Sequence, residues 1–195
     1  MYRSFMQLLI KRLFDLFFSA LLIILFLPTW ILIAILIKID SQGPVFYTHQ
    51  RISLNGKEFN CFKYRSMLVG ADDKTLVSSS KDSRVTKIGS FLRKTSLDET
   101  PQFINVFLGH MSIVGPRPAI PSQVKEFSKK DFDKLLVKPG LTGWTQVNGR
   151  NSIPYEKRME LDCWYAKNWN LLLDFKILLK TIFVIFRQEG IYDVK

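Results

Sequence analysis

Two adjacent carboxylates, Asp98 and Glu99, follow the cations Arg93 and Lys94 and directly precede Thr100-Pro101. A proline just after a polar cluster marks the start of a helix. A carboxylate at a helix N-terminus beside cations stays ionised and faces any group that approaches this positive end. It can bind a metal ion, or attack phosphorus to give an acyl phosphate. With two acids in sequence, one can be the nucleophile while the other assists.

The same residues also fit a purely structural interpretation. Ser96 and Glu99 have the spacing of a capping box. Thr100 followed by Pro101 matches an N-cap residue with proline at the first helical position. The sequence alone leaves the chemical and the capping interpretations open.

Three arginines lie in segments rich in turn residues: Arg65, Arg117 and Arg150. Pro116 and Pro118 flank Arg117 and stiffen its backbone, while the glycines before Arg150 allow the main chain to approach a ligand closely. A nucleotide diphosphate needs guanidinium groups, backbone donors and usually Mg²⁺. Singly, each arginine is an ordinary surface or ion-pair residue. Together, on a chain of net charge +11, they favour an anionic ligand, although charge alone does not choose between nucleic acid, anionic lipid and a phosphorylated substrate.

An uncharged apolar segment, residues 16–37, must position this chemistry at a membrane. A straight helix of this length just crosses a hydrocarbon core of roughly 30 Å. Pro28 near its middle leaves two short arms, and basic residues flank both ends, which favours a bent helix that enters and leaves by one face. An ordinary kinked helix that spans the bilayer is the alternative.

The remaining chain predicts a small domain with few strands. Two apolar runs, residues 45–47 and 59–64, flank Asn55-Gly56 and predict a hairpin. We expect helices near residues 100–108, 121–136, 155–169 and 171–186, and a surface loop over residues 70–84. The last helix is either interfacial or an ordinary core helix, and Trp164, Tyr165 and Trp169 before it fit a headgroup region. Cys61 and Cys163 fit neither a zinc site nor a disulfide framework, which indicates a reducing compartment.

Several motifs in fixed order cover essentially the whole chain, and together they are far more specific than any one of them. They are Lys11-Arg12-Leu13-Phe14-Asp15, the segment around Pro28, Phe62-Lys63-Tyr64-Arg65-Ser66-Met67, Leu92-Arg93-Lys94-Thr95-Ser96-Leu97-Asp98-Glu99, Asn105-Val106, Ser112-Ile113-Val114-Gly115-Pro116-Arg117-Pro118, residues 139–150, Glu160-Leu161-Asp162 with Trp164-Tyr165, and Glu189-Gly190-Ile191. This series resembles the bacterial sugar transferase family, the small monotopic phosphoglycosyl transferases. The chain has no large N-terminal addition and so resembles the minimal catalytic form.

The resemblance implies a re-entrant membrane helix, dependence on Mg²⁺, a covalent phosphosugar intermediate, UMP as leaving group and undecaprenyl phosphate as acceptor. It makes Asp98 the nucleophile and metal ligand, Glu99 its catalytic partner, and Arg117 and Arg150 phosphate or uridine contacts. Many members have serine before the helix-breaking proline, where this chain has Leu27. Leucine offers no hydroxyl to the freed carbonyls, and Thr29 is a possible substitute.

We therefore expect a mainly helical α+β protein, with a re-entrant helix and flanks over residues 1–39 and a membrane-associated cytosolic catalytic domain over residues 40–195. The re-entrant helix and interfacial amphipathic helices are expected to anchor this domain to the membrane. The expected reaction transfers a phosphosugar from a UDP-sugar to undecaprenyl phosphate at the cytoplasmic face of the bacterial inner membrane, as the first membrane step of a surface glycan. Its partners are the donor, the lipid acceptor and membrane lipids, without nucleic acid. Further expected substrate-binding residues are Arg65, Arg93, Pro116 and Pro118.

Two rival interpretations account for the net charge or the membrane segment by a non-catalytic function. A non-catalytic basic module that binds anionic lipid or nucleic acid explains the net charge but not the acid pair. A structural subunit that has lost activity would have no need of intact Asp98 and Glu99.

Overall fold

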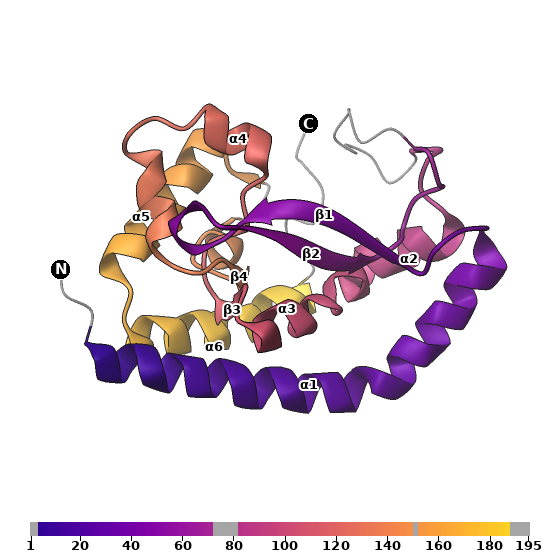
Figure 1. The fold of residues 1–195 in the computed structure, drawn as a ribbon, viewed down its shortest axis with the longest axis horizontal. Helices are drawn as coiled ribbons and strands as arrows, with labels where there is room; N and C mark the ends of the chain where they lie inside the picture. The colour runs from indigo at the N-terminus through magenta and orange to yellow at the C-terminus, as the bar shows by residue number, and fades with distance from the viewer. Residues whose placement is uncertain (1–3, 72–81, 150–151, 188–195) are drawn as a thin grey trace.

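The computed structural model describes residues 4–71, 82–149 and 152–187 and shows a mainly helical α+β protein. Its longest element is α1 (Phe5–Asp40), which runs along the base of the molecule and bends in its C-terminal part (Figure 1). The helices α2 (Lys87–Thr95), α3 (Gln102–Leu108), α4 (Pro121–Lys125), α5 (Tyr155–Asn168) and α6 (Leu171–Arg187) surround a hairpin and a short parallel pair of strands. The predicted loop over residues 70–84 falls mostly outside the described residues.

The hairpin confirms the turn predicted at Asn55-Gly56. The strands β1 (Phe46–Ile52) and β2 (Glu58–Tyr64) pair antiparallel, with Phe46 opposite Tyr64 and Ile52 opposite Glu58. Asn55, in the short 3₁₀ turn η1 (Leu54–Gly56), has a φ of 56°, a left-handed conformation that asparagine tolerates. The second pair joins β3 (Ser112–Val114) to β4 (Gly140–Thr142) in parallel.

The helix α1 contains Pro28 and exposes most of its apolar side chains. Among the described residues it alone is long and apolar enough to cross a membrane by length and composition. Phe26 and Trp30, one on each side of Pro28, both contact the ring of Phe103 in α3, at 5.6 Å and 6.5 Å between centroids. Because residues four apart share one face of a helix, Phe26 and Trp30 together pack the part of α1 around Pro28 against α3.

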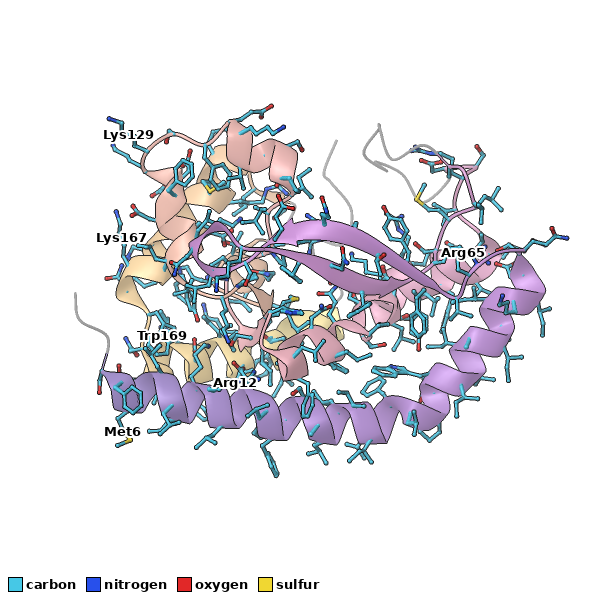
Figure 2. The ribbon with its side chains drawn as sticks, viewed as in Figure 1. Met6, Arg12, Arg65, Lys129, Lys167 and Trp169 are labelled. Carbon is cyan, nitrogen blue, oxygen red and sulfur yellow. The ribbon has the colours of Figure 1, made fainter. Side chains whose placement is uncertain are left out.

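Polar side chains hold the N-terminal half of α1 to the domain. Arg12 donates to the carbonyls of Val106 and Phe107 at the end of α3, at 2.8 Å each, and Figure 2 shows it pointing from α1 toward the domain, whereas Met6 points away. Asp15 accepts hydrogen bonds from the backbone N–H of Ile113 and from a neighbouring serine hydroxyl. These hydrogen bonds of Arg12 and Asp15 fix the position of α1 along its axis relative to the domain.

The segment that follows β3 corrects one predicted helix. The prediction of a single helix over residues 121–136 is wrong, because α4 ends at Lys125 and a separate 3₁₀ helix, η3 (Asp131–Leu136), follows. Between the two, the Asp131 carboxylate accepts a hydrogen bond from the backbone N–H of Ser128. An aspartate that bonds nearby backbone in this way favours a turn over a continuous helix.

The last helix, α6, buries Ile177 in the core yet exposes a row of apolar side chains, which are Leu172, Phe175, Leu179, Ile182 and Phe183.

Tyr165 and Trp169 do not lie in a headgroup region, contrary to the sequence-based expectation. Both are buried in the core, and both donate to the carboxylate of Asp174 in α6, at 2.6 Å and 2.8 Å. Lys11 of α1 reaches the same carboxylate. Their polar atoms are satisfied by this buried network, so these rings need no contact with water or lipid headgroups.

Candidate active site

The two acids lie in a single 3₁₀ turn, η2 (Leu97–Glu99), between α2 and α3. Ser96, with a φ of 58°, ends α2 in the left-handed conformation, and its side chain caps nothing in η2. Thr100 has helical backbone angles, and its hydroxyl donates to the carbonyl of Leu97 while accepting from the indole of Trp30 at 3.0 Å. Both capping interpretations are therefore wrong, and the acids are left for another role.

Asp98 is a partly buried carboxylate that receives no hydrogen bond from the described residues. Burial raises the pKa of Asp98 to about 6, with the Glu99 charge acting in the same direction and Lys63, Arg93 and Arg117 opposing it. Its oxygens are thus surrounded by cations without being used by any of them. A carboxylate in this condition is available to a ligand.

Glu99, in contrast, is held by the protein. The ammonium of Lys63 in β2 lies 2.6 Å from Glu99 Oε1, and the guanidinium of Arg117 lies 3.6 Å from the same oxygen. The two adjacent acids therefore differ in environment, which is the condition under which two carboxylates take different roles.

Arg117 is positioned by a clamped loop that follows β3. The backbone N–H of Gly115 donates to Thr142, and that of Gly140 donates to the carbonyl of Pro116, at 2.8 Å each. A Cβ on Gly140 would lie 2.0 Å from the nitrogen of Gly115, so only glycine permits this approach. The packing of these two backbone segments thus requires glycine at positions 140 and 143.

Pro116 and Pro118 contribute backbone rather than side-chain groups to this loop. Pro116 is fully buried, and the carbonyl of Pro118 accepts from the guanidinium of Arg51 in β1 at 3.1 Å. The side chain of Arg117 is 55% exposed between them. The loop therefore presents a guanidinium to solvent beside the acid pair.

A shallow pocket between the hairpin, η2 and this loop encloses about 270 Å³, open mouth included. Its lining includes three cations and one of the acids, namely Arg51, Lys63, Arg117 and Glu99, together with His49, Cys61, Gln102, Pro118, Gly140 and Leu141. Burial lowers the pKa of Arg51 to about 10, helped by the Arg117 charge, yet the guanidinium stays protonated at neutral pH. Three cations around one pocket suit a ligand with clustered negative charge.

Sequence reasoning did not select His49, Arg51, Lys63 or Gln102 as site residues. The signal that identifies the first three is the alternation of the hairpin. Because residues paired across a hairpin point to the same face, His49 with Cys61, and Arg51 with Phe59, share the face of Lys63. Only the packing of that face over η2 shows that it lines a site.

The other predicted residues divide into three groups. Arg93, in the last turn of α2, acts on Asp98 electrostatically. Arg65 lies at the other end of the hairpin, where its guanidinium donates to the carbonyls of Ser41 and Gln42 at the end of α1 (Figure 2), so the structure does not bring it to the acid pair. Arg150 lies outside the described residues.

The expected Mg²⁺ has a plausible ligand in this donor set. Mg²⁺ is commonly held by one or two carboxylates with substrate phosphates and water completing the octahedron, rather than by a protein cage. Within the described ranges no cluster of three or more His, Cys, Asp or Glu forms such a cage. Asp98 supplies one carboxylate without hydrogen-bond donors of its own, so the residues present fit a metal shared with the substrate.

Comparison with known proteins identifies the family. The profile described as bacterial sugar transferase matches residues 6–188. The chain belongs to this family. It is 39% identical to the undecaprenyl-phosphate galactose phosphotransferase of Salmonella typhimurium and 40% identical to the UDP-glucose:undecaprenyl-phosphate glucose-1-phosphate transferase of Escherichia coli, each over 94% of this chain and 42% of the relative.

A Bacillus subtilis protein named as an uncharacterized sugar transferase, EpsL, is 41% identical over 93% of this chain and 90% of its own length. The chain thus spans less than half the length of the two enzymes named above and nearly all of EpsL. The matched range, residues 6–188, contains the acid pair, the clamped Arg117 loop and the hairpin of this chain.

Proposed function

We propose that the protein transfers a sugar 1-phosphate from a UDP-sugar to undecaprenyl phosphate, giving undecaprenyl diphosphate sugar and UMP. The observation that carries this proposal is the acid pair beside a pocket lined by three cations, with one carboxylate that receives no hydrogen bond from the described residues. The Salmonella and Escherichia relatives are both named for transfer to undecaprenyl phosphate, and the second is also named for UDP-glucose, which supports the same substrate classes here.

In the first half-reaction, an Asp98 oxygen attacks the phosphorus that carries the sugar. A bond forms between Asp98 and this phosphorus, the bond from phosphorus to the bridging oxygen breaks, and the electron pair leaves with UMP. Arg117 and Lys63, which both line the pocket, would stabilise charge on the diphosphate, since charge-assisted bonds of this kind are about twice as strong as neutral ones. The product is an aspartyl phosphosugar.

In the second half-reaction, a phosphate oxygen of the lipid attacks the same phosphorus, and the Asp98 carboxylate leaves. The acceptor is already ionised and needs little help as a nucleophile. Glu99, fixed by Lys63 at 2.6 Å, keeps both its own position and that of the ammonium beside the reacting phosphorus. Dividing one displacement into two easier ones is the general advantage of a covalent intermediate.

Asp98 would hold Mg²⁺ together with the donor phosphates. Bound there, the ion supplies neutralisation of the diphosphate charge. Asp98 is both the expected ligand and the expected nucleophile, so one of its oxygens serves each role.

We further propose that α1 is re-entrant and that the site faces the cytoplasm. The bend of α1, the apolar side chains that it exposes and the basic residues at both of its ends support this topology (Figure 1). The exposed apolar row of α6 would then lie in the interfacial region beside it. Long lipid substrates remain in the bilayer, so a site directly above the surface meets their phosphate.

The decisive experiment measures UMP release by purified protein in detergent with Mg²⁺, a panel of UDP-sugars and polyprenyl phosphate. The panel also identifies the sugar. A basic module without catalytic activity would release no UMP from any donor.

The role of Asp98 is tested with Asp98→Asn and a donor labelled in the sugar. Asparagine keeps the shape but is a far weaker nucleophile, so we expect turnover to fall by at least about three orders of magnitude, or ~4 kcal/mol of barrier. After acid quench and peptide mapping, label should lie on Asp98 of the wild type. Label on another residue, or near-normal turnover by the variant, would remove Asp98 from this role.

A further inference from the structure

His49 lines the pocket with a polar ring that the described residues leave without a hydrogen-bond partner. It lies in β1, opposite Cys61, on the hairpin face that covers the acid pair. Neither ring nitrogen has a hydrogen-bond partner among the described residues, and both nitrogens are shielded from solvent. The ring stacks on Tyr47 at 5.6 Å between centroids, which fixes its plane without engaging its nitrogens.

Such an arrangement is unfavourable for the protein alone. A buried polar atom without a partner typically destabilises a fold by about 1–3 kcal/mol. Apolar side chains of similar size would pack against Tyr47 without this penalty. An unsatisfied polar group at a pocket wall therefore indicates a partner that arrives with the ligand.

The charge state of the imidazole limits what that partner is. Burial lowers the pKa of His49 to about 3, and the charges of Arg51, Lys63 and Arg117 act in the same direction while Glu99 opposes them. The ring is therefore neutral at physiological pH, with one N–H donor and one acceptor nitrogen. It cannot strengthen the binding of phosphate as a cation does, and it matches an uncharged group that both donates and accepts.

We propose that His49 is a donor-binding residue whose neutral imidazole hydrogen-bonds an uncharged polar group of the nucleotide sugar, either a sugar hydroxyl or the uracil ring. This inference rests on the proposed function, because it places a UDP-sugar in the pocket. It adds a contact for the part of the donor that carries no charge.

The register of the hairpin supports a site in which the cations bind the diphosphate of the donor and His49 binds an uncharged part of it. Lys63 pairs with Tyr47, His49 with Cys61, and Arg51 with Phe59, so His49 lies one step along the hairpin from each of two cations. Same-face residues on one strand are separated by about 6–7 Å, which is within the reach of a single nucleotide sugar. A diphosphate bound by the cations would thus leave a neighbouring hydroxyl or ring edge against the imidazole.

The test compares His49→Phe and His49→Gln with wild type, measuring the KM for the UDP-sugar, the inhibition constant of UMP and the thermal unfolding midpoint. Phenylalanine keeps a ring against Tyr47 and removes both nitrogens, whereas glutamine keeps one donor and one acceptor. Gln50→Ala is the matched control, because Gln50 is exposed on the opposite face of the same strand.

We expect His49→Phe to raise the donor KM roughly three- to tenfold, the range for loss of one or two hydrogen bonds, with an unfolding midpoint equal to or above that of wild type. His49→Gln should restore most of the affinity, and Gln50→Ala should match wild type. If the UMP inhibition constant rises in parallel, the partner is the uracil ring. If it does not change, the partner is a sugar hydroxyl.

Two outcomes would overturn the inference. One is a donor KM for His49→Phe within twofold of an active wild type. The other is a lowered unfolding midpoint in both variants with equal loss of activity, since that marks a structural role. Failure of the wild type to release UMP is a different result, because it refutes the proposed function itself.

Discussion

Replacing Arg117 should separate donor binding from protein stability. Its guanidinium lies 3.6 Å from Glu99, and its side chain is 55% exposed. An exposed ion pair of this length contributes about 0–1 kcal/mol to folding, and Glu99 keeps its 2.6 Å contact with Lys63. Arg117→Met should therefore change the unfolding midpoint by no more than a few degrees.

The effect on the donor should be much larger. A guanidinium that binds a phosphate makes charge-assisted bonds worth about 1.5–3 kcal/mol, which corresponds to a 12- to 150-fold change in affinity. We expect the donor KM of Arg117→Met to rise by this factor. The donor KM of Arg117→Lys should lie between those of the wild type and Arg117→Met, since an ammonium supplies charge without the planar fork of a guanidinium.

The assay follows UMP release while the UDP-sugar is varied at saturating polyprenyl phosphate, and then with the roles reversed. Lys129→Met is a matched control that removes one positive charge from an exposed residue remote from the pocket (Figure 2). An unchanged donor KM would refute the placement of Arg117 in the donor site. An equal rise in the KM of both substrates would indicate a general electrostatic effect instead of a donor contact.

Three further predictions follow from other parts of the structure. Chelation of divalent ions should abolish UMP release and excess Mg²⁺ should restore it, whereas activity that persists in EDTA would exclude the metal. A cysteine at Ser4 should resist impermeant thiol reagents in intact cells and react after permeabilisation, because a re-entrant α1 keeps both ends inside; labelling from outside would favour a spanning helix. Trp30→Phe should lower the free energy of unfolding by about 1–2 kcal/mol, because it removes the buried 3.0 Å bond to Thr100 but keeps an aromatic ring near Phe103; an unchanged unfolding midpoint in detergent would show that this bond contributes nothing.

Sequence reasoning succeeded where the signal is local. Asn55-Gly56 between two apolar runs specifies a hairpin through backbone conformation alone, and α1 follows from an uncharged run too long for an ordinary core helix. Each of these features depends on residues within a few positions of one another.

Sequence reasoning failed where residues far apart in the sequence supply the contacts that determine the local structure. The capping box at Ser96 was plausible by spacing, but α2 ends there in a left-handed turn, and Trp30 from α1 occupies the hydroxyl of Thr100 instead. Trp169 looked interfacial by composition, yet a buried Asp174 satisfies its indole. The histidine at position 49 carries no motif at all, and only the folding of the hairpin over η2 places it in the pocket.

The same long-range contacts join the membrane helix to the chemistry. Trp30 in α1 bonds Thr100, which directly follows Glu99, and Arg12 in α1 binds the carbonyls at the far end of α3. The acid pair and the helix that follows it are thereby fixed to α1 at two points along its length. About half of the exposed large apolar side chains of the described residues lie on α1. In the proposed topology, the depth of α1 in the bilayer would set the height of Asp98 above the lipid phosphates. A transferase whose acceptor stays in the membrane would need this fixed height, and the contacts between α1 and the η2–α3 segment would supply it.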